Sequence, residues 1–278
     1  MNIGQGHGKK GEFLGTGTSL EKAKIVIVPV PFDKTSTYQK GSDKGPSALI
    51  EASRNLELYD IDTDSEPYKK GIYTSAPIEA KSSKQMIEKT YEKVLHYLEH
   101  KKFVVTLGGE HTISYGAIKA HAEFYGPLTV LQFDAHADLF PLYENNRWSH
   151  ASVMARVLEL PKVSNIVSLG IRSLSAEELP NLKKTYHKLS KLKDPIYITF
   201  DLDAFDSSLM PSTGTPEPGG FFWNEAIETL KFVFSHYNVI GFDIVELLPN
   251  KQNHAPDYLA AKLLYKMLAF KFYNRGSK

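Results

Sequence analysis

Residues 128–138, LTVLQFDAHAD, join an apolar run to three side chains that can bind a metal ion. The run 128–133 is typical of a buried strand. Asp134, His136 and Asp138 follow at a spacing of two, and in an extended chain side chains two apart point to the same side. Buried carboxylates are costly unless a cation meets them. The stretch therefore predicts a metal site at a strand end. The alternative is a salt-bridged strand end with a chance histidine.

Composition narrows the kind of site that this chain can build. The 278 residues include 33 Lys plus Arg, 32 Asp plus Glu and no cysteine, for a net charge of +1. The balanced charge gives no indication of a nucleic-acid partner, and the lack of cysteine restricts a metal to nitrogen and oxygen ligands. The N-terminus lacks a signal-peptide pattern, and no apolar run approaches the roughly 20 residues that span a bilayer. We expect a soluble, cytoplasmic protein without a membrane partner.

Apolar strands alternate with amphipathic helices along the chain, which predicts βαβ units, a mainly parallel sheet and helices on both faces. The predicted strands are 24–30, 71–79, 103–107, 128–134, 166–170, 196–203 and 239–246. The predicted helices are 47–55, a segment from Ser82 or Ser83 to about 98, 114–124, 150–160, 223–234 and 256–272. Residues 1–22 are glycine-rich and predict an N-terminal arm or loop, and we expect residues 23–278 to form a single domain.

Further polar side chains lie at the carboxyl ends of other predicted strands, where ligands bind in open parallel sheets. These are His111, the pair Asp201 and Asp203, and Glu246. Each alone has an ordinary interpretation: a helix start for His111, charged loop residues for the two aspartates, and a solvated strand end for Glu246. Without Glu246, these residues and the three side chains of 134–138 provide six ligands, four carboxylates and two imidazoles: His111, Asp134, His136, Asp138, Asp201 and Asp203. Two ions that share bridging carboxylates would use such a set, and it suits Mn²⁺ better than Fe²⁺, Co²⁺ or Ni²⁺.

Five segments together resemble the ureohydrolase family, which includes arginases and agmatinases. They are GGEH (108–111), DAHAD (134–138), SHASVM (149–154), FDLDAFD (200–206) and TGTPEPGG (213–220). The resemblance extends over about residues 24–270. It implies the arginase/deacetylase fold, a three-layer α/β/α sandwich, with two Mn²⁺ ions in each subunit. It also suggests a homo-oligomer, either a trimer or a hexamer.

The resemblance also implies roles for individual residues. One ion would be held by His111, Asp134, Asp138 and Asp201, and the other by Asp134, His136, Asp201 and Asp203. A hydroxide that bridges the two ions would attack the guanidino carbon. Glu246 would receive the substrate guanidinium, and His150 would transfer a proton to the departing amine.

The substrate is expected to be agmatine, giving putrescine and urea in polyamine biosynthesis. The loop 139–149 does not display the Asn- and Ser-based arginase pattern, whereas residues 38–46 and 58–60 look like those of agmatinases. Two features depart from the family: Ser207 stands where a proline is common, and Arg147 lies in the loop expected to meet the substrate tail. An arginase or a guanidino-acid hydrolase, such as a guanidinobutyrase, is therefore kept as an alternative. Two further hypotheses are a deacetylase with a single zinc ion and a catalytically silent paralogue that binds a guanidino ligand.

Overall fold

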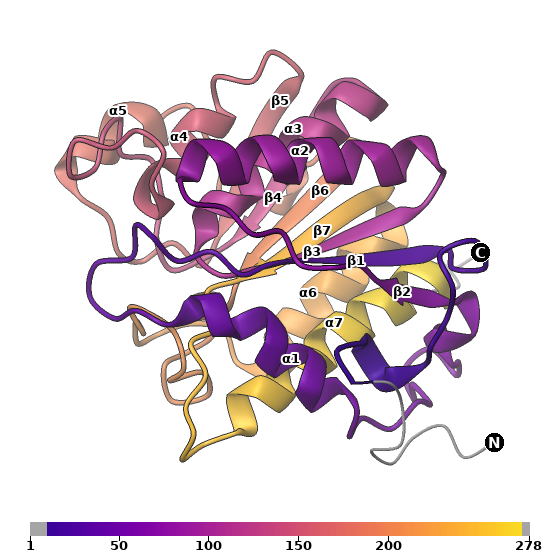
Figure 1. The fold of residues 1–278 in the computed structure, drawn as a ribbon. Helices are drawn as coiled ribbons and strands as arrows, with labels where there is room; N and C mark the ends of the chain where they lie inside the picture. Colours follow the sequence, from indigo (N-terminus) through magenta and orange to yellow (C-terminus); the bar gives the residue numbers. More distant parts are fainter. Residues whose placement is uncertain (1–9, 274–278) are drawn as a thin grey trace.

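The computed structural model describes residues 10–273, and its core is one parallel sheet of seven strands (Figure 1). The strand order is β2-β1-β3-β7-β6-β4-β5, and every pair is parallel. The strands are β1 Ile25–Val30, β2 Ile72–Thr74, β3 Phe103–Gly108, β4 Leu128–Phe133, β5 Val163–Leu169, β6 Ile196–Asp201 and β7 Val239–Val245.

Helices cover both faces of the sheet and complete the expected three-layer arrangement (Figure 1). One layer contains α2 (Ser83–Glu99), α3 (Ser114–Tyr125) and α4 (Val153–Val157), which pack against one another in that order. The opposite layer contains α1 (Gly45–Ser53), α6 (Trp223–His236) and α7 (Ala255–Tyr273). The short helix α5 spans Leu179–Leu182.

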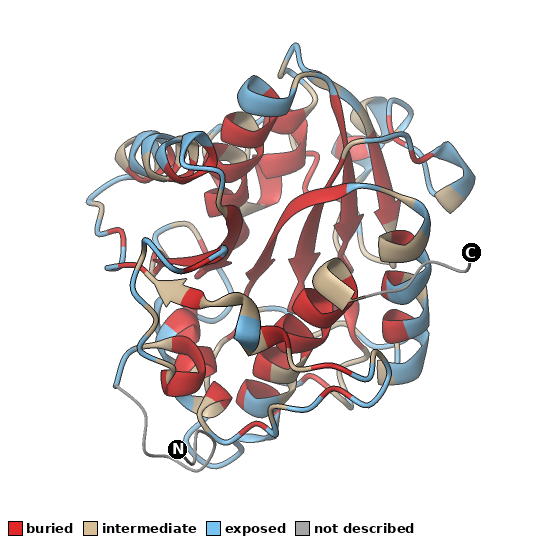
Figure 2. Ribbon diagram, turned by 90° about the vertical axis from the view of Figure 1, so that its right-hand side faces the viewer, coloured by how far each residue is buried: buried red, intermediate tan, exposed pale blue. Residues whose placement is uncertain are grey.

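Alternation along each strand decides which helical layer a side chain meets. In β4, Leu131 and Phe133 belong to the core under α1, α6 and α7, whereas Val130 belongs to the core under α2 and α3. Every residue of β1, β3, β4, β6 and β7 is buried (Figure 2). This double coverage explains why these strands are apolar in unbroken runs rather than in alternation.

The sheet order brings the predicted site residues together. Because all strands are parallel, their carboxyl ends lie at one edge of the sheet. The four strands that precede the candidate residues are neighbours, in the order β3-β7-β6-β4. Segments that are more than one hundred residues apart in the chain therefore meet above the middle of the sheet.

Two predicted elements are shorter in the structure than expected. The helix expected at 150–160 is a 3-10 turn, His150–Ser152, followed by α4, whose first amides at Met154 and Ala155 both donate to Asp138 O. The strand expected at 71–79 stops at Thr74. It pairs only with β1, and Pro77 has no amide proton with which to extend the pairing.

The N-terminal segment falls partly outside the described residues, which begin at residue 10. Within 10–22, the side chain of Phe13 is fully buried and the amide of Leu14 donates to Ser53 Oγ at 2.8 Å. This part of the segment therefore packs against α1. Across residues 10–273, none of the helices combines the length and the apolar character needed to cross a membrane.

His121 is a titratable group placed inside the apolar layer between α3 and the sheet. It is completely buried, its ring lies 4.7 Å from the ring of Tyr197, and Nδ1 bonds to Ala117 O at 2.9 Å. Nε2 has no hydrogen-bond partner among the described residues. Burial lowers the pKa of His121 to about 4.

Replacing His121 by phenylalanine should make the stability less sensitive to acid. Between pH 6.5 and 4 the unfolded chain binds a proton at this position that the folded chain refuses, so stability is lost as pH falls through that window. For a folded pKa of about 4, the loss reaches about 2.5 kcal/mol by pH 4.5. Urea unfolding at pH 7.5 and 4.5 measures it. An equal acid loss in wild type and His121→Phe would contradict the assignment.

Candidate metal centre and cleft

The aspartates that follow β4 and β6 are turned toward one another by local hydrogen bonds. β4 ends at Phe133, so the stretch 134–138 is not simply a continued strand. The amide of His136 donates to Asp134 Oδ1 at 2.6 Å, and the amide of Asp203 donates to Asp201 Oδ1 at 2.9 Å. These are Asx turns, in which an aspartate caps its own backbone two residues on. The side chains at the expected spacing of two are thus brought together by turns, and not by an extended backbone.

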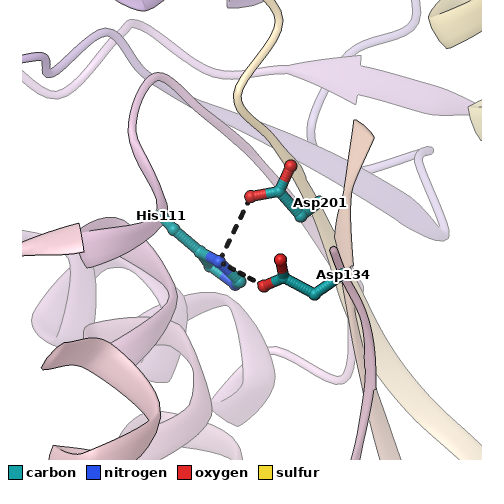
Figure 3. A group of neighbouring side chains, drawn as sticks. All are labelled: His111, Asp134 and Asp201. Carbon is teal, nitrogen blue, oxygen red and sulfur yellow. Dashed lines mark ion pairs between the residues drawn. The ribbon is translucent and has the colours of Figure 1, made fainter. Parts of the chain in front are cut away.

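The first group of side chains surrounds Nδ1 of His111, which lies in a 3-10 turn just after β3. Nδ1 lies 3.2 Å from Asp134 Oδ2, 3.0 Å from Asp138 Oδ2 and 3.4 Å from Asp201 Oδ2. Figure 3 shows His111 pointing between Asp134 and Asp201. Each of these four side chains is almost completely buried.

The second group shares Asp134 with the first and adds His136 and Asp203. His136 Nδ1 lies 2.8 Å from Asp203 Oδ2 and 3.8 Å from Asp134 Oδ1. Asp203 Oδ1 also accepts the amide of Ala135 at 3.0 Å, which joins the loops after β6 and β4. Potential ligand atoms of His111, Asp134 and Asp201 lie within 4.8 Å of one another, and so do those of Asp134, His136 and Asp203. Asp138 joins the first group through its 3.0 Å contact with His111. The six residues predicted as metal ligands are therefore gathered at one place, and their role as ligands stays a prediction.

The electrostatics of this cluster require positive charge. Burial, with the charges of Asp138 and Asp203, raises the pKa of Asp134 to about 7. Burial and the neighbouring aspartates raise the pKa of Asp201 well above its usual range. Burial alone would lower the pKa of His136, but the adjoining Asp203 raises it to about 11. Carboxylates at such positions are stable in ionised form only beside a cation.

The hydrogen-bond partners of His111 show where that cation fits. Its Nε2 lies 2.8 Å from Thr199 Oγ1, and Thr199 Oγ1 donates to Asp243 Oδ1 at 2.7 Å. A hydroxyl has a single proton, so Thr199 accepts from Nε2–H, and in the neutral ring the lone pair of Nδ1 faces the aspartates. Nδ1 has no hydrogen-bond partner among the described residues. A lone pair that faces three carboxylate oxygens fits a metal cation, and the all-nitrogen-and-oxygen donor set fits a hard divalent ion.

Three residues that brace this centre were missed in the sequence. Thr199 and Asp243 orient His111, as described above. The guanidinium of Arg172 donates to five backbone carbonyls, including Asp203 O at 2.8 Å and Glu217 O at 2.8 Å. Arg172 thus ties the second group to the 213–220 loop. The planar guanidinium presents several N–H donors in a fixed fork, which suits it to bridge carbonyls of separate loops.

Beside the cluster lies a cleft of about 400 Å³. Its lining includes His136, Asp138, Asp201 and Asp203 from the cluster, together with His150 and Glu246. The two residues with expected catalytic roles are thus in the same cleft as the candidate ligands. Their roles themselves stay predictions.

Glu246 reaches the cleft through an unusual backbone conformation. Its φ is 66°, in the left-handed region, and its amide donates to Gly109 O at 2.8 Å. Its Oε1 accepts the amide of His111 at 2.7 Å. These reciprocal bonds lock the end of β7 to the end of β3. A carboxylate has about four acceptor sites, so Glu246 keeps capacity for a ligand in the cleft.

A cluster of candidate metal ligands beside a cleft, at the carboxyl edge of a parallel three-layer sheet, is typical of metal-dependent α/β enzymes. The arginase family profile matches residues 23–269 of this chain. The chain belongs to the arginase family, and within it is an agmatinase-like ureohydrolase.

Individual relatives agree over nearly the full length. The chain is 34% identical to N(1)-aminopropylagmatine ureohydrolase of Thermus thermophilus, covering 93% of this chain and 94% of that protein. It is 33% identical to agmatinase of Bacillus cereus, covering 85% and 88%. Among solved structures, agmatine ureohydrolase of Thermoplasma volcanium superposes with a TM-score of 0.86 at 29% identity, over 94% of each chain.

Removing the Thr199 hydroxyl should weaken metal binding. Thr199→Val loses the acceptor that orients His111, and the loss of such an outer partner typically costs about 10- to 100-fold in metal affinity. Titration calorimetry with Mn²⁺ measures the change. Thr129→Val is the matched control, because Thr129 is also fully buried in a strand but its hydroxyl has no partner among the described residues. Equal affinities of the two variants would refute the orienting role.

Proposed function

We propose that this protein hydrolyses the guanidino group of agmatine to give putrescine and urea. The observation that carries the substrate class is the charge of the cleft. Six of its lining residues are acidic, and no lysine or arginine in the described chain lines it. Three of these acids, Asp138, Asp201 and Asp203, are candidate ligands whose charge the cations would offset, which leaves Glu178, Glu217 and Glu246 to face a substrate. A substrate with a cationic tail suits such walls, whereas a carboxylate tail would be repelled.

The position of Arg147 supports an amine tail over an acidic one. In the sequence this residue kept a guanidino acid open as an alternative substrate, because it lies in the loop expected to meet the substrate tail. In the structure its guanidinium donates to Glu159 Oε2 at 2.8 Å and lies 5.2 Å from the ring of Trp148. It is not among the residues that line the cleft.

The candidate ligand set supports two Mn²⁺ ions, because the side chains form two groups that have Asp134 in common. A guanidinium carbon is a poor electrophile, because resonance spreads the charge over three nitrogens. Divalent ions at this position would lower the pKa of a water molecule and so supply a nucleophile at neutral pH. A single zinc ion would leave either His111 or the pair His136 and Asp203 without a cation, which argues against the deacetylase reading.

The remaining steps belong to residues of the cleft wall. Glu246 would accept the substrate guanidinium in charge-assisted hydrogen bonds and hold its carbon over the metal centre. His150 would give a proton to the departing amine nitrogen as the C–N bond breaks, and then recover a proton from solvent. The structure supports these roles by placing both residues in one cleft with the aspartates.

N(1)-aminopropylagmatine is a second candidate substrate. Proteins with that activity are among the relatives at 34% identity. The longer tail carries one more amine, and the cleft offers two acidic residues besides the candidate ligands and Glu246. These are Glu178 and Glu217, the latter with its side chain about one third exposed.

A substrate panel tests the function. The protein, reconstituted with Mn²⁺ and checked by elemental analysis for two ions per chain, should release urea from agmatine or N(1)-aminopropylagmatine. Because the acidic walls repel a carboxylate, kcat/KM for arginine and for 4-guanidinobutyrate should be lower than for agmatine by about 100-fold or more. A chelated sample is the control. Preferred turnover of 4-guanidinobutyrate would refute the cationic-tail assignment. Absence of urea from all four compounds would favour the alternative hypothesis, a protein that binds guanidino compounds without hydrolysing them.

His150→Asn should keep both metal ions and lose most turnover. General acid catalysis contributes about 10²- to 10⁴-fold, so kcat for urea release should fall by about 100-fold or more. His100→Asn, an exposed histidine on the far end of α2, is the matched control and should behave as wild type. An unchanged kcat in His150→Asn would remove this residue from the mechanism.

A further inference from the structure

His150 has two hydrogen-bonding groups directed at the same atom, the hydroxyl oxygen of Thr35. The backbone amide of His150 donates to Thr35 Oγ1 at 3.0 Å. The ring nitrogen Nδ1 lies 3.2 Å from the same oxygen. The ring of Tyr143 packs edge-on against the imidazole at 5.6 Å between centroids. The imidazole is therefore fixed on one side, and Nε2 is the nitrogen left for the cleft.

Thr35 is in turn held by a buried carboxylate. Glu110 is completely buried, and its Oε1 accepts the Thr35 hydroxyl at 2.8 Å and the Thr112 hydroxyl at 3.0 Å. Its Oε2 accepts the backbone amides of Thr35 at 2.6 Å and Ser36 at 3.0 Å. With the Ser36 hydroxyl, which donates to Oε2 at 3.5 Å, five donors converge on this one side chain and anchor the 35–36 segment beside the cleft.

The donor and acceptor capacity of the Thr35 hydroxyl then determines which nitrogen of the neutral His150 ring carries the proton. A threonine hydroxyl has one proton and two lone pairs. The proton goes to the carboxylate at 2.8 Å, since charge-assisted bonds are the strongest available. Both lone pairs accept, one from the His150 amide and one from Nδ1–H. The neutral ring therefore carries its proton on Nδ1.

We propose that Thr35, anchored by Glu110, is a positioning residue that holds the His150 imidazole in its Nδ1-protonated form with Nε2 free for the cleft. The inference rests on the proposed function for its catalytic consequence. When His150 gives its Nε2 proton to the departing amine, the ring that remains is this Nδ1–H form. Thr35 thus stabilises the product of the proton transfer as well as the orientation of the donor.

The ring protonation can be measured without any turnover. Two-bond ¹H–¹⁵N correlation spectra of the full chain with labelled histidine and bound Zn²⁺, which is diamagnetic, distinguish the two neutral forms. The His150 signals are identified by their absence in His150→Asn. Wild type, Thr35→Ser and Thr112→Val should show the Nδ1–H form, whereas Thr35→Val should lose it. An Nε2–H ring in wild type, or an Nδ1–H ring in Thr35→Val, would overturn the proposal.

Kinetics on the Mn²⁺ protein provide the second measurement. Thr35→Val should lower kcat for urea release by about 10- to 100-fold, which is less than the loss expected when the general acid itself is removed. KM and metal content should not change. Thr35→Ser should restore most of the rate. In a His150→Asn background, Thr35→Val should cause no further loss. An equal loss in Thr35→Val and Thr35→Ser would indicate a purely structural role. An inactive wild type would refute the proposed function, while the spectra would still test the ring assignment.

Discussion

The arrangement of this protein depends on four buried aspartates that face one another at the edge of the sheet. Repulsion among Asp134, Asp138, Asp201 and Asp203 and their removal from water are both unfavourable, and the two nearby imidazoles offset them only when positively charged. Much of the surrounding structure serves to keep these groups in place. Arg172 braces the loops, and the Asx turns orient the carboxylates. The arrangement is unfavourable on its own and becomes favourable with bound cations.

Two histidines of this site are each held through a threonine by a buried carboxylate, with opposite results. For His111, Thr199 and Asp243 engage Nε2, which turns Nδ1 toward the aspartates. For His150, Thr35 and Glu110 engage Nδ1, which leaves Nε2 for the cleft. The same arrangement of histidine, threonine and carboxylate thus leaves Nδ1 of His111 facing the aspartates and Nε2 of His150 available to the cleft. The two proposed roles, metal ligand and proton donor, require these opposite orientations.

The sequence predicted the sheet, the helices and the six candidate ligands, because these leave periodic or local traces. Apolar runs indicate the buried strands, and polar residues just after them indicate the carboxyl edge. The bracing residues left no such trace. Thr35 is 115 residues from His150, and Thr199 is 44 residues from Asp243, so only the folded chain brings them together. The partner of Arg147 could not be predicted either, because Glu159 lies twelve residues further along the chain, beyond α4.

The place of β7 in the sheet has a consequence for how the molecule folds. β7 is the last strand of the chain, yet it lies between β3 and β6. Until residues 239–245 are available, the sheet can form only as two separate halves with open edges, one carrying His111 and the other carrying the aspartates. Such distant pairing is slow to form and leaves strand edges exposed meanwhile. On the ribosome, the nascent chain therefore cannot complete its candidate metal centre before residues 239–245 have been synthesised.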